Sequence, residues 1–216
     1  MLKTNIFAGG ITNLTDARYF AARGAQYLSF NLDNGASLNI SPEKMAAIKE
    51  WVEGPSFIGT FQIATADEIA FLIERLDLQL IQIGPFISIE TLAEKNISIP
   101  IIKEIVIEDL NTLVENFKTE EKLFQSFDFI FLNFEKNGLT WSAIKESSIV
   151  FDLLKNWKLN SKLVLAIAHE PSETEEILAQ INPHGLYLQG GEEEKVGFKS
   201  YEDLDEILDV LETEDW

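Results

Sequence analysis

Residues 56–83 read SFIGTFQIATADEIAFLIERLDLQLIQI, which is one strand–helix–strand unit. Ser56–Phe61 and Leu78–Ile83 are short apolar runs of strand length. Between them, apolar residues recur at helical spacing over Ile69–Leu76, so they share one helix face. The preceding Thr65-x-x-Glu68 has the spacing of a capping box, in which a hydroxyl and a carboxylate satisfy backbone N–H groups at a helix start. Two apolar strands joined by an amphipathic helix predict parallel pairing.

The same alternation fills the rest of the chain without a linker rich in Pro, Gly or Ser. Further strand-like runs are Asn5–Ala8, Tyr27–Phe30, Ile101–Ile107, Phe127–Leu132, Lys162–Ala166 and Gly185–Leu188. Eight strands, each followed by a helical segment, in 216 residues predict an α/β fold, a single (β/α)₈ TIM barrel, over residues 1–216. The fourth unit is the weakest, since Ile87–Glu94 allows only about two helical turns. An open doubly wound sheet is the alternative, but no G-x-G-x-x-G follows a strand. We expect residues 212–216 to be a frayed acidic tail.

Composition excludes several functions. The chain has 17 Lys and Arg against 36 Asp and Glu, a formal charge of −19, and no cysteine. Disulfides, zinc–thiolate sites and cysteine nucleophiles are therefore ruled out. The negative charge argues against nucleic acid and membrane partners. No apolar run approaches the ~20 residues needed to span a bilayer, and no signal peptide is evident, so we expect a cytoplasmic protein. We also expect no metal and no cofactor, and we interpret Glu192–Glu194 as solvated surface.

In a barrel of this kind, function lies at the C-terminal ends of the strands and in the loops that follow them. The residues at these places are Gly9, Gly10, Asn31, Asp33, Gln62, Gln82, Gly84, Asn133, Glu135, Lys136, Ala168, His169, Glu170, Gln189, Gly190 and Gly191.

Three segments resemble one family. They read GGITNLTDAR at 9–18, GAQYLSFN at 24–31 and ISPE at 40–43, and weaker echoes follow in order through Gly197-x-Lys199. The chain is similar in these segments to phosphoribosylanthranilate isomerase, the small barrel enzyme of tryptophan biosynthesis. This resemblance implies an Amadori rearrangement, in which a general acid and a general base face each other across the barrel mouth.

Key positions depart from the pattern that the resemblance implies. Gly9 stands where the family has its cysteine base, and Asn133 stands where it has its aspartic acid. Leu38 replaces the substrate-binding arginine, and Gly84 lies at or next to the place of a histidine. An amide cannot exchange a proton near neutral pH, so both members of the proton-transfer pair are missing.

Few residues could replace the missing acid and base. Asp33, Glu135 and His169 follow strand ends and are the candidate replacement acids or bases, although each also fits an ordinary loop residue. Lys136 could attract an anion. Asp16 is expected to cap the first helix and His184 to be structural.

A ligand at this rim would contact Gln82, Gln189, Gly190, Gly191 and Ala168. Gln82 is the best of these candidates because a buried amide needs partners. The family resemblance suggests a small anionic or sugar-phosphate-like ligand, which Glu192–Glu194 would repel if it carried two charges.

Three functional hypotheses remain open. The first is a diverged barrel without normal isomerase activity, either silent or acting on another small ligand. The second is an active isomerase that uses Asp33 and Glu135 as substitutes. The third is a non-enzymatic binding or regulatory scaffold, whose mouth would be plugged by side chains such as Phe7 and Leu38. The sequence is compatible with a monomer or a homodimer.

Overall fold

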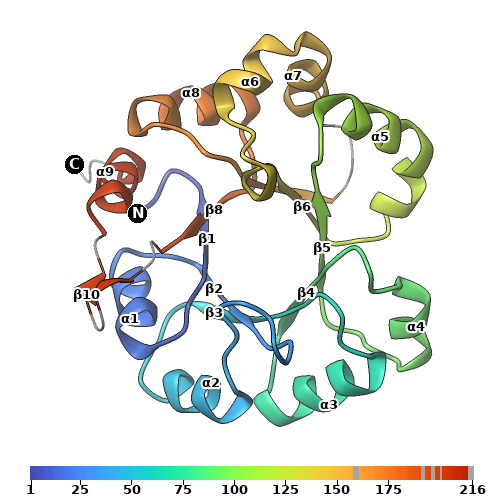
Figure 1. Cartoon of the computed structure of the whole chain (residues 1–216), viewed down its shortest axis with the longest axis vertical. Helices are drawn as coiled ribbons and strands as arrows, with labels where there is room; N and C mark the ends of the chain where they lie inside the picture. The colour runs from blue at the N-terminus through green and yellow to red at the C-terminus, as the bar shows by residue number, and fades with distance from the viewer. Residues whose placement is uncertain (158–160, 191–192, 196–197, 200, 214–216) are drawn as a thin grey trace.

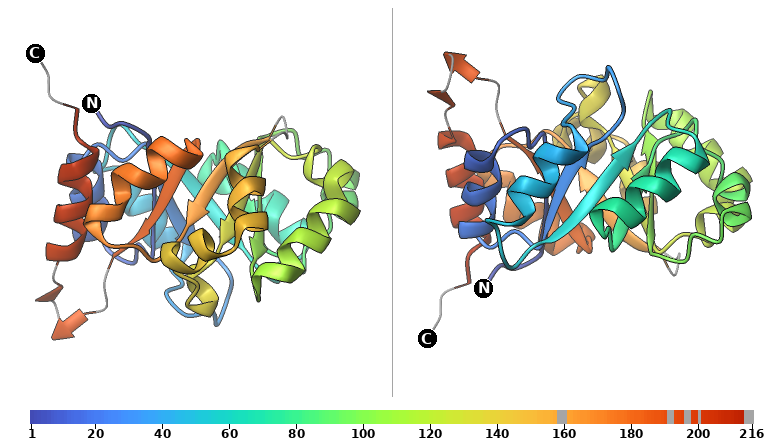
Figure 2. Two further views of the ribbon diagram at one scale, coloured as in Figure 1. Left: turned by 90° about the horizontal axis from the view of Figure 1, so that it is seen from above. Right: turned by 90° about the horizontal axis from the view of Figure 1, so that it is seen from below.

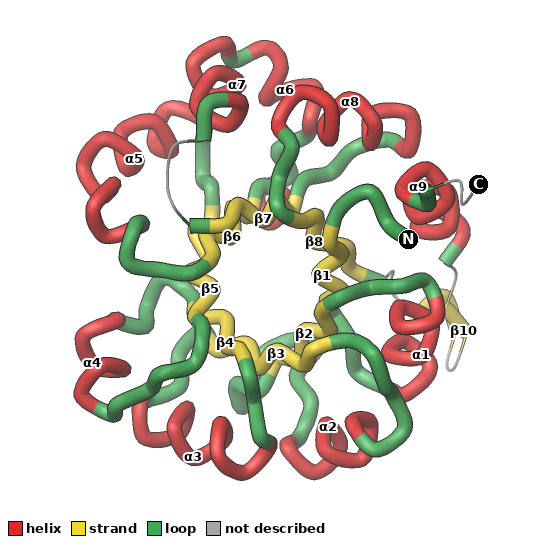
Figure 3. Tube along the Cα trace, turned by 180° about the vertical axis from the view of Figure 1, so that it is seen from behind, coloured by secondary structure: helices red, strands yellow, loops and turns green. Residues whose placement is uncertain are grey.

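The computed structural model describes residues 1–157, 161–190, 193–195, 198–199 and 201–213. Eight parallel strands close into a barrel in sequential order, and Figures 1 and 3 show it from its two ends. They are β1 Asn5–Gly9, β2 Tyr27–Asn31, β3 Ser56–Phe61, β4 Leu80–Ile83, β5 Ile101–Val106, β6 Phe129–Asn133, β7 Lys162–Ala166 and β8 Gly185–Gln189. The predicted strands and their order are confirmed, with boundaries within two residues.

Helices form a ring outside the barrel (Figure 1). They are α1 Leu14–Ala22, α2 Pro42–Lys49, α3 Ala66–Leu76, α4 Ile89–Glu94, α5 Leu110–Phe124, α6 Trp141–Glu146, α7 Ser148–Lys155, α8 Pro171–Ile181 and α9 Glu202–Leu211, with the 3₁₀ helix η1 at Glu135–Asn137. As predicted, the fourth unit has a short helix. A two-stranded hairpin of β9 Glu193–Lys195 and β10 Phe198–Lys199, which the sequence did not predict, projects beyond the start of α9 (Figure 2).

Local sequence signals fix the helix ends. The Thr65 hydroxyl accepts from the Glu68 N–H, and the Glu68 carboxylate accepts from the Thr65 N–H, so the predicted capping box is present. At α2 the Ser41 hydroxyl accepts from the Lys44 N–H and so caps the helix, one residue before Pro42. Gly24 has φ +80°, the left-handed backbone that ends α1.

The barrel has two apolar layers because strand side chains alternate between faces. Ile6, Leu28 and Ile81 point outward into the layer beneath the helices. Ile58 and Phe129 point inward and fill the barrel interior with the other members of the inner cluster. The inward set begins at the N-terminal end of the barrel and gives way to polar residues toward the C-terminal end.

The predicted tail needs a correction at its start. Glu212 forms a β-bridge with Leu2, and the Thr213 N–H donates to the Met1 carbonyl at 2.8 Å. These two residues are paired rather than frayed, because backbone groups at the chain ends satisfy each other. Residues 214–216 lie outside the described residues. No described helix combines the length and the apolar character needed to cross a membrane.

Candidate functional site

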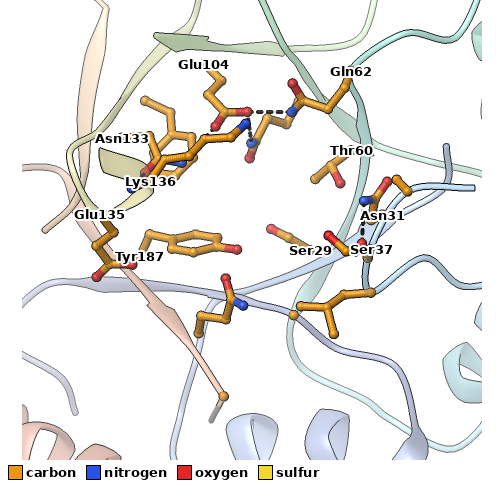
Figure 4. A pocket seen from close by; sticks show the side chains of 17 residues that line it. Ser29, Asn31, Ser37, Thr60, Gln62, Glu104, Asn133, Glu135, Lys136 and Tyr187 are labelled. Atoms are coloured by element: carbon orange, nitrogen blue, oxygen red, sulfur yellow. Dashed lines mark hydrogen bonds between the residues drawn. The ribbon is translucent and has the colours of Figure 1, made fainter. Parts of the chain in front are cut away.

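A cavity of about 680 Å³ opens at the C-terminal end of the barrel. Of its 17 lining residues, 12 have polar or charged side chains (Figure 4). The amide side chains are Asn31, Gln62, Gln82, Asn133 and Gln189, the hydroxyls are Ser29, Ser37, Thr60 and Tyr187, and the charged groups are Glu104, Glu135 and Lys136.

Strand alternation brings these side chains together. Glu104 follows Ile102 by two residues on β5, so both face into the barrel, with the carboxylate nearer the mouth. Asn133 stands in the same relation to Phe131 on β6. The barrel closure then converts separate inward positions on different strands into one polar ring.

Glu104 is the centre of the best-ordered part of this ring. Its side chain is only 3% exposed. Its Oε1 accepts a hydrogen bond from Asn133 Nδ2 at 2.8 Å, and its Oε2 accepts from Gln62 Nε2 at 2.6 Å and Gln82 Nε2 at 3.3 Å (Figure 4). Three amides from three neighbouring strands or loops therefore stabilise one buried carboxylate.

Asn133 is also held from its other side. Its Oδ1 accepts from the Lys136 backbone N–H at 3.1 Å, at the start of η1. The amide thus joins the β6–α6 loop to Glu104, and both of its polar ends are used.

Two glycines leave space that neighbouring side chains occupy. A Cβ on Gly9 would overlap the Tyr187 hydroxyl, and the ring atom Cε2 of Tyr187 would lie only 2.5 Å away. A Cβ on Gly84 would overlap the Gln62 carboxamide, whose Cδ would lie 2.6 Å from it. The absence of a side chain at residue 84 is what lets Gln62 reach Glu104.

Glu135 and Tyr187 are two groups at the mouth whose pKa values are raised above the ordinary ones. Burial raises the pKa of Glu135 to about 7, well above the usual carboxyl value. The pKa of Tyr187 is raised mainly by burial and further by the charges of Glu104 and Glu135, so the hydroxyl keeps its proton. Figure 4 shows the Tyr187 hydroxyl pointing across the cavity toward Ser29. The Ser29 hydroxyl is buried and has no hydrogen-bond partner among the described residues.

Asp33 does not line this cavity. Its carboxylate accepts hydrogen bonds from the backbone N–H groups of Gln62, Ile63 and Ala64, the latter two at 3.2 and 3.1 Å. It is 2% exposed and fixes the β3–α3 loop. Of the two predicted carboxylates, Glu135 therefore lines the cavity and Asp33 does not.

The other sequence candidates divide in the same way. Gln82, Gln189 and Gly190 line the cavity. Ala168 and His169 do not: the Ala168 carbonyl accepts from the Trp141 N–H, and His169 Nδ1 lies 2.8 Å from the Ile167 carbonyl. Gly191 and Glu192 lie outside the described residues.

Leu38 reaches the rim of the cavity from the β2–α2 loop. It is 47% exposed, and its φ of +54° is unusual for a branched side chain. The cavity therefore has an apolar residue in a sparsely populated backbone conformation at its edge. Phe7 lies deeper, stacked on Tyr27 with ring centroids 4.2 Å apart, and does not enter the cavity.

Asp16 and His184 have structural contacts. Asp16 is 1% exposed, and its carboxylate accepts from Asn13 Nδ2 at 3.1 Å and from the Tyr201 hydroxyl at 2.5 Å. Its backbone N–H donates to the Asn13 side chain, so Asn13 is the cap of α1. The His184 carbonyl accepts from Asn5 Nδ2 at 2.7 Å.

The helix after β7 has no free N-terminus for an anion. The Glu170 N–H donates to the Glu173 carboxylate at 3.1 Å, and the Glu173 N–H donates to the Glu170 carbonyl at 2.9 Å. The first turn of α9 carries Glu202, Asp203 and Asp205. Carboxylates at both places compete with a bound anion.

Sequence reasoning missed Glu104 and Tyr187. Glu104 lies two residues after Ile102 on β5, and Tyr187 lies two residues after Gly185 on β8, so both side chains point into the barrel. This alternation along the strand is the signal that could have found them. The alternation could not predict which side chains would bind Glu104 and Tyr187.

The described residues contain no cluster of three His, Asp or Glu that could hold a metal ion.

The sequence of this chain matches the model of one protein family, and solved structures share its fold. The family model described as N-(5′-phosphoribosyl)anthranilate isomerase matches residues 8–210. The structure is similar to phosphoribosylanthranilate isomerase from Thermus thermophilus, with a TM-score of 0.71 and 25% identity over 96% of this chain and 98% of that one. The isomerase from Thermotoga maritima has a TM-score of 0.77 and 19% identity with the same coverage. Triosephosphate isomerase from Bartonella henselae, at 14% identity, TM-score 0.56 and coverage of 95% and 98%, shares the barrel fold. No curated protein matches the chain.

Proposed function

The chain belongs to the N-(5′-phosphoribosyl)anthranilate isomerase family, and from this premise we propose that it is a diverged member without normal isomerase activity. Its cavity at the barrel mouth binds a different small polar ligand.

The Gly9–Tyr187 contact carries this proposal. In the family pattern, residue 9 is a cysteine base, but a Cβ at Gly9 would overlap the Tyr187 hydroxyl. The Tyr187 side chain is partly buried, and its hydroxyl, whose pKa is raised, keeps its proton and is a poor base at neutral pH. On the opposite side Asn133, in the place of the acid, has both polar ends in hydrogen bonds. Loss of one proton-transfer group typically costs about 10²- to 10⁴-fold in rate.

The lining supports a neutral, hydroxyl-rich ligand. Amides and hydroxyls surround the cavity, and the Ser29 hydroxyl has no partner among the described residues. Glu104 and Glu135 line the cavity with one lysine, so a dianion would meet net repulsion once Glu135 ionises, above its pKa of about 7. The capped start of α8 removes a further site for phosphate. The family resemblance suggests a sugar phosphate as the ligand. The cavity lining supports binding of the sugar better than binding of the phosphate.

The open cavity also bears on the scaffold hypothesis. Phe7 is packed below the cavity floor, and Leu38 stays at the rim, so the expected plug is not formed. A cavity of about 680 Å³ lies in the range of small-molecule sites.

Two measurements test the proposal. Purified protein is assayed with phosphoribosylanthranilate, and we expect kcat/KM at least about 10⁴-fold below ordinary enzyme values. Thermal-shift screening is then run with unphosphorylated sugars and with the same sugars phosphorylated. We expect a dose-dependent rise in Tm with the former and a smaller one with the latter. Turnover at normal rates, or a preference for the phosphates, would refute the proposal.

One observation favours an active isomerase as the second candidate. Glu135 lines the cavity, and its pKa of about 7 suits proton transfer at neutral pH. If this candidate is right, the protein turns over the substrate and Glu135→Gln abolishes activity. The matched change Glu53→Gln, at an exposed position remote from the cavity lining, would leave activity intact.

A further inference from the structure

A second cavity, of about 740 Å³, lies at the opposite end of the barrel. It is formed around the N-terminal ends of the strands: Asn5 begins β1, Lys162 begins β7, and His184 precedes β8. Figure 3 views the barrel from this end. Nothing in the proposed function uses this cavity.

Its charge is opposite to that of the protein as a whole. The chain carries −19, yet the cavity is lined by Lys3, Lys155, Lys162 and His184, and by no Asp or Glu among the residues that the structure describes. Like charges gathered in a strongly acidic chain create a local positive potential that attracts anions.

Two of the lysines have no carboxylate partner. Within the described part of the chain, Lys155 and Lys162 form no ion pair, and their ammonium groups lie 5.9 Å above Phe151 and 4.9 Å above Phe129. Lys3 pairs with Glu175 at 2.9 Å, outside the cavity lining. Two cationic charges are therefore available to a ligand.

A polar group in the cavity wall also has no hydrogen-bond partner in the part of the chain that the structure describes. Ser161 is 4% exposed, lines the cavity, and its hydroxyl makes no hydrogen bond among the described residues. The neighbouring Trp157 is fixed by donation from Nε1 to the Ser161 carbonyl at 3.0 Å. A buried hydroxyl left unsatisfied beside two lysines favours a ligand oxygen at this place.

The positive charge of Lys162 also acts on His184. The pKa of this histidine is lowered, first by burial and then by the charge of Lys162. Neutral imidazole keeps one ring nitrogen able to donate to an anion.

We propose that this cavity binds a small anion with two or more negative charges, carried by phosphate or carboxylate groups, through Lys155, Lys162 and the Ser161 hydroxyl. It is a second site, independent of the cavity at the barrel mouth.

Titration calorimetry with inorganic phosphate and with citrate, at fixed ionic strength, tests this. We expect saturable binding of one of them with a stoichiometry of one, weakened by added NaCl. The stronger probe tells whether phosphate or carboxylate is preferred. The double change Lys155→Gln and Lys162→Gln should raise Kd by about tenfold or more. Ser161→Ala, which leaves the charge unchanged, should raise Kd by a smaller factor.

Two matched lysines serve as controls. Lys44→Gln removes an exposed charge on α2, and Lys136→Gln removes the charge at the barrel mouth. Both should leave Kd unchanged. The proposal is overturned if neither anion binds at millimolar concentration, if the double variant binds as well as the wild type, or if Lys136→Gln causes the loss.

Discussion

The hydroxyl of Tyr187 fills the volume in which a side chain of residue 9 would begin. Gly9 ends β1 and Tyr187 lies on the adjacent β8, paired with Phe7, so the two residues meet across neighbouring strands. The contact is made by the rigid end of an aromatic ring, which cannot fold away. The identities of residues 9 and 187 are therefore coupled.

This coupling predicts a double-mutant cycle. Gly9→Ala alone should lower the free energy of unfolding by about 1–3 kcal/mol through overpacking. In a Tyr187→Leu background, which frees the space, the same change should cost much less. Urea denaturation of the four proteins measures both values. Equal costs of Gly9→Ala in the two backgrounds would contradict the coupling.

Glu135 predicts a pH dependence. Its pKa is 4.5 in the unfolded chain and about 7 in the folded protein. A raised carboxyl pKa gives stability that is fully present below pH 4.5 and is lost as the pH rises through 7. The difference between these two pKa values corresponds to at most about 3.4 kcal/mol.

Glu135→Gln should therefore be more stable than the wild type at pH 8, and this advantage should shrink toward pH 5. Denaturation at several pH values measures it. Glu53→Gln, at an exposed position, is the control and should show no such trend. A difference between Glu135→Gln and wild type that is constant with pH would rule out the raised pKa.

Glu104→Gln should disturb the three-amide cluster. One carboxylate oxygen becomes an NH₂ group, so at least one of the three donors from Gln62, Gln82 and Asn133 loses its acceptor unless an amide turns over. Asn133 cannot turn without losing its bond from the Lys136 N–H. We expect a loss of about 1–3 kcal/mol in unfolding free energy. A neutral effect in urea denaturation would mean that the amides reorganise freely.

Asn133→Asp is a complementary change at the same cluster. A second carboxylate would face Glu104 at the position where Nδ2 now lies 2.8 Å away. We expect destabilisation at pH 8 that is relieved as the pH falls and one carboxyl takes up a proton. The variant by itself should not gain isomerase activity in the phosphoribosylanthranilate assay, because residue 9 still has no side chain.

Asp33→Asn should affect stability rather than ligand binding. The carboxylate accepts three backbone N–H groups of the β3–α3 loop, and an amide presents only one acceptor oxygen. The loss should be about 1–3 kcal/mol, with binding at the mouth unchanged in the thermal-shift assay. Asp152→Asn, on the exposed face of α7, is the control. Loss of ligand response without loss of stability would instead assign Asp33 to the site.

The sequence by itself determined the barrel. Alternating apolar strands and amphipathic helices, with caps such as Thr65 and Glu68, act over a few residues, and local spacing is enough to predict them. The same spacing nominated the mouth residues Gln82 and Glu135, because the ends of parallel strands meet at one rim. The family resemblance at residues 9–18 came from the same linear information.

Only the tertiary structure decided how these residues are used. Glu135 lines the cavity, whereas Asp33 does not, because the backbone N–H groups of residues 62–64 bind the Asp33 carboxylate. Glu104 became central because amides from other strands converge on it, and Gly9 is closed off by a tyrosine 178 positions later. Such contacts join distant parts of the chain, and their geometry is set by closure of the barrel rather than by local sequence.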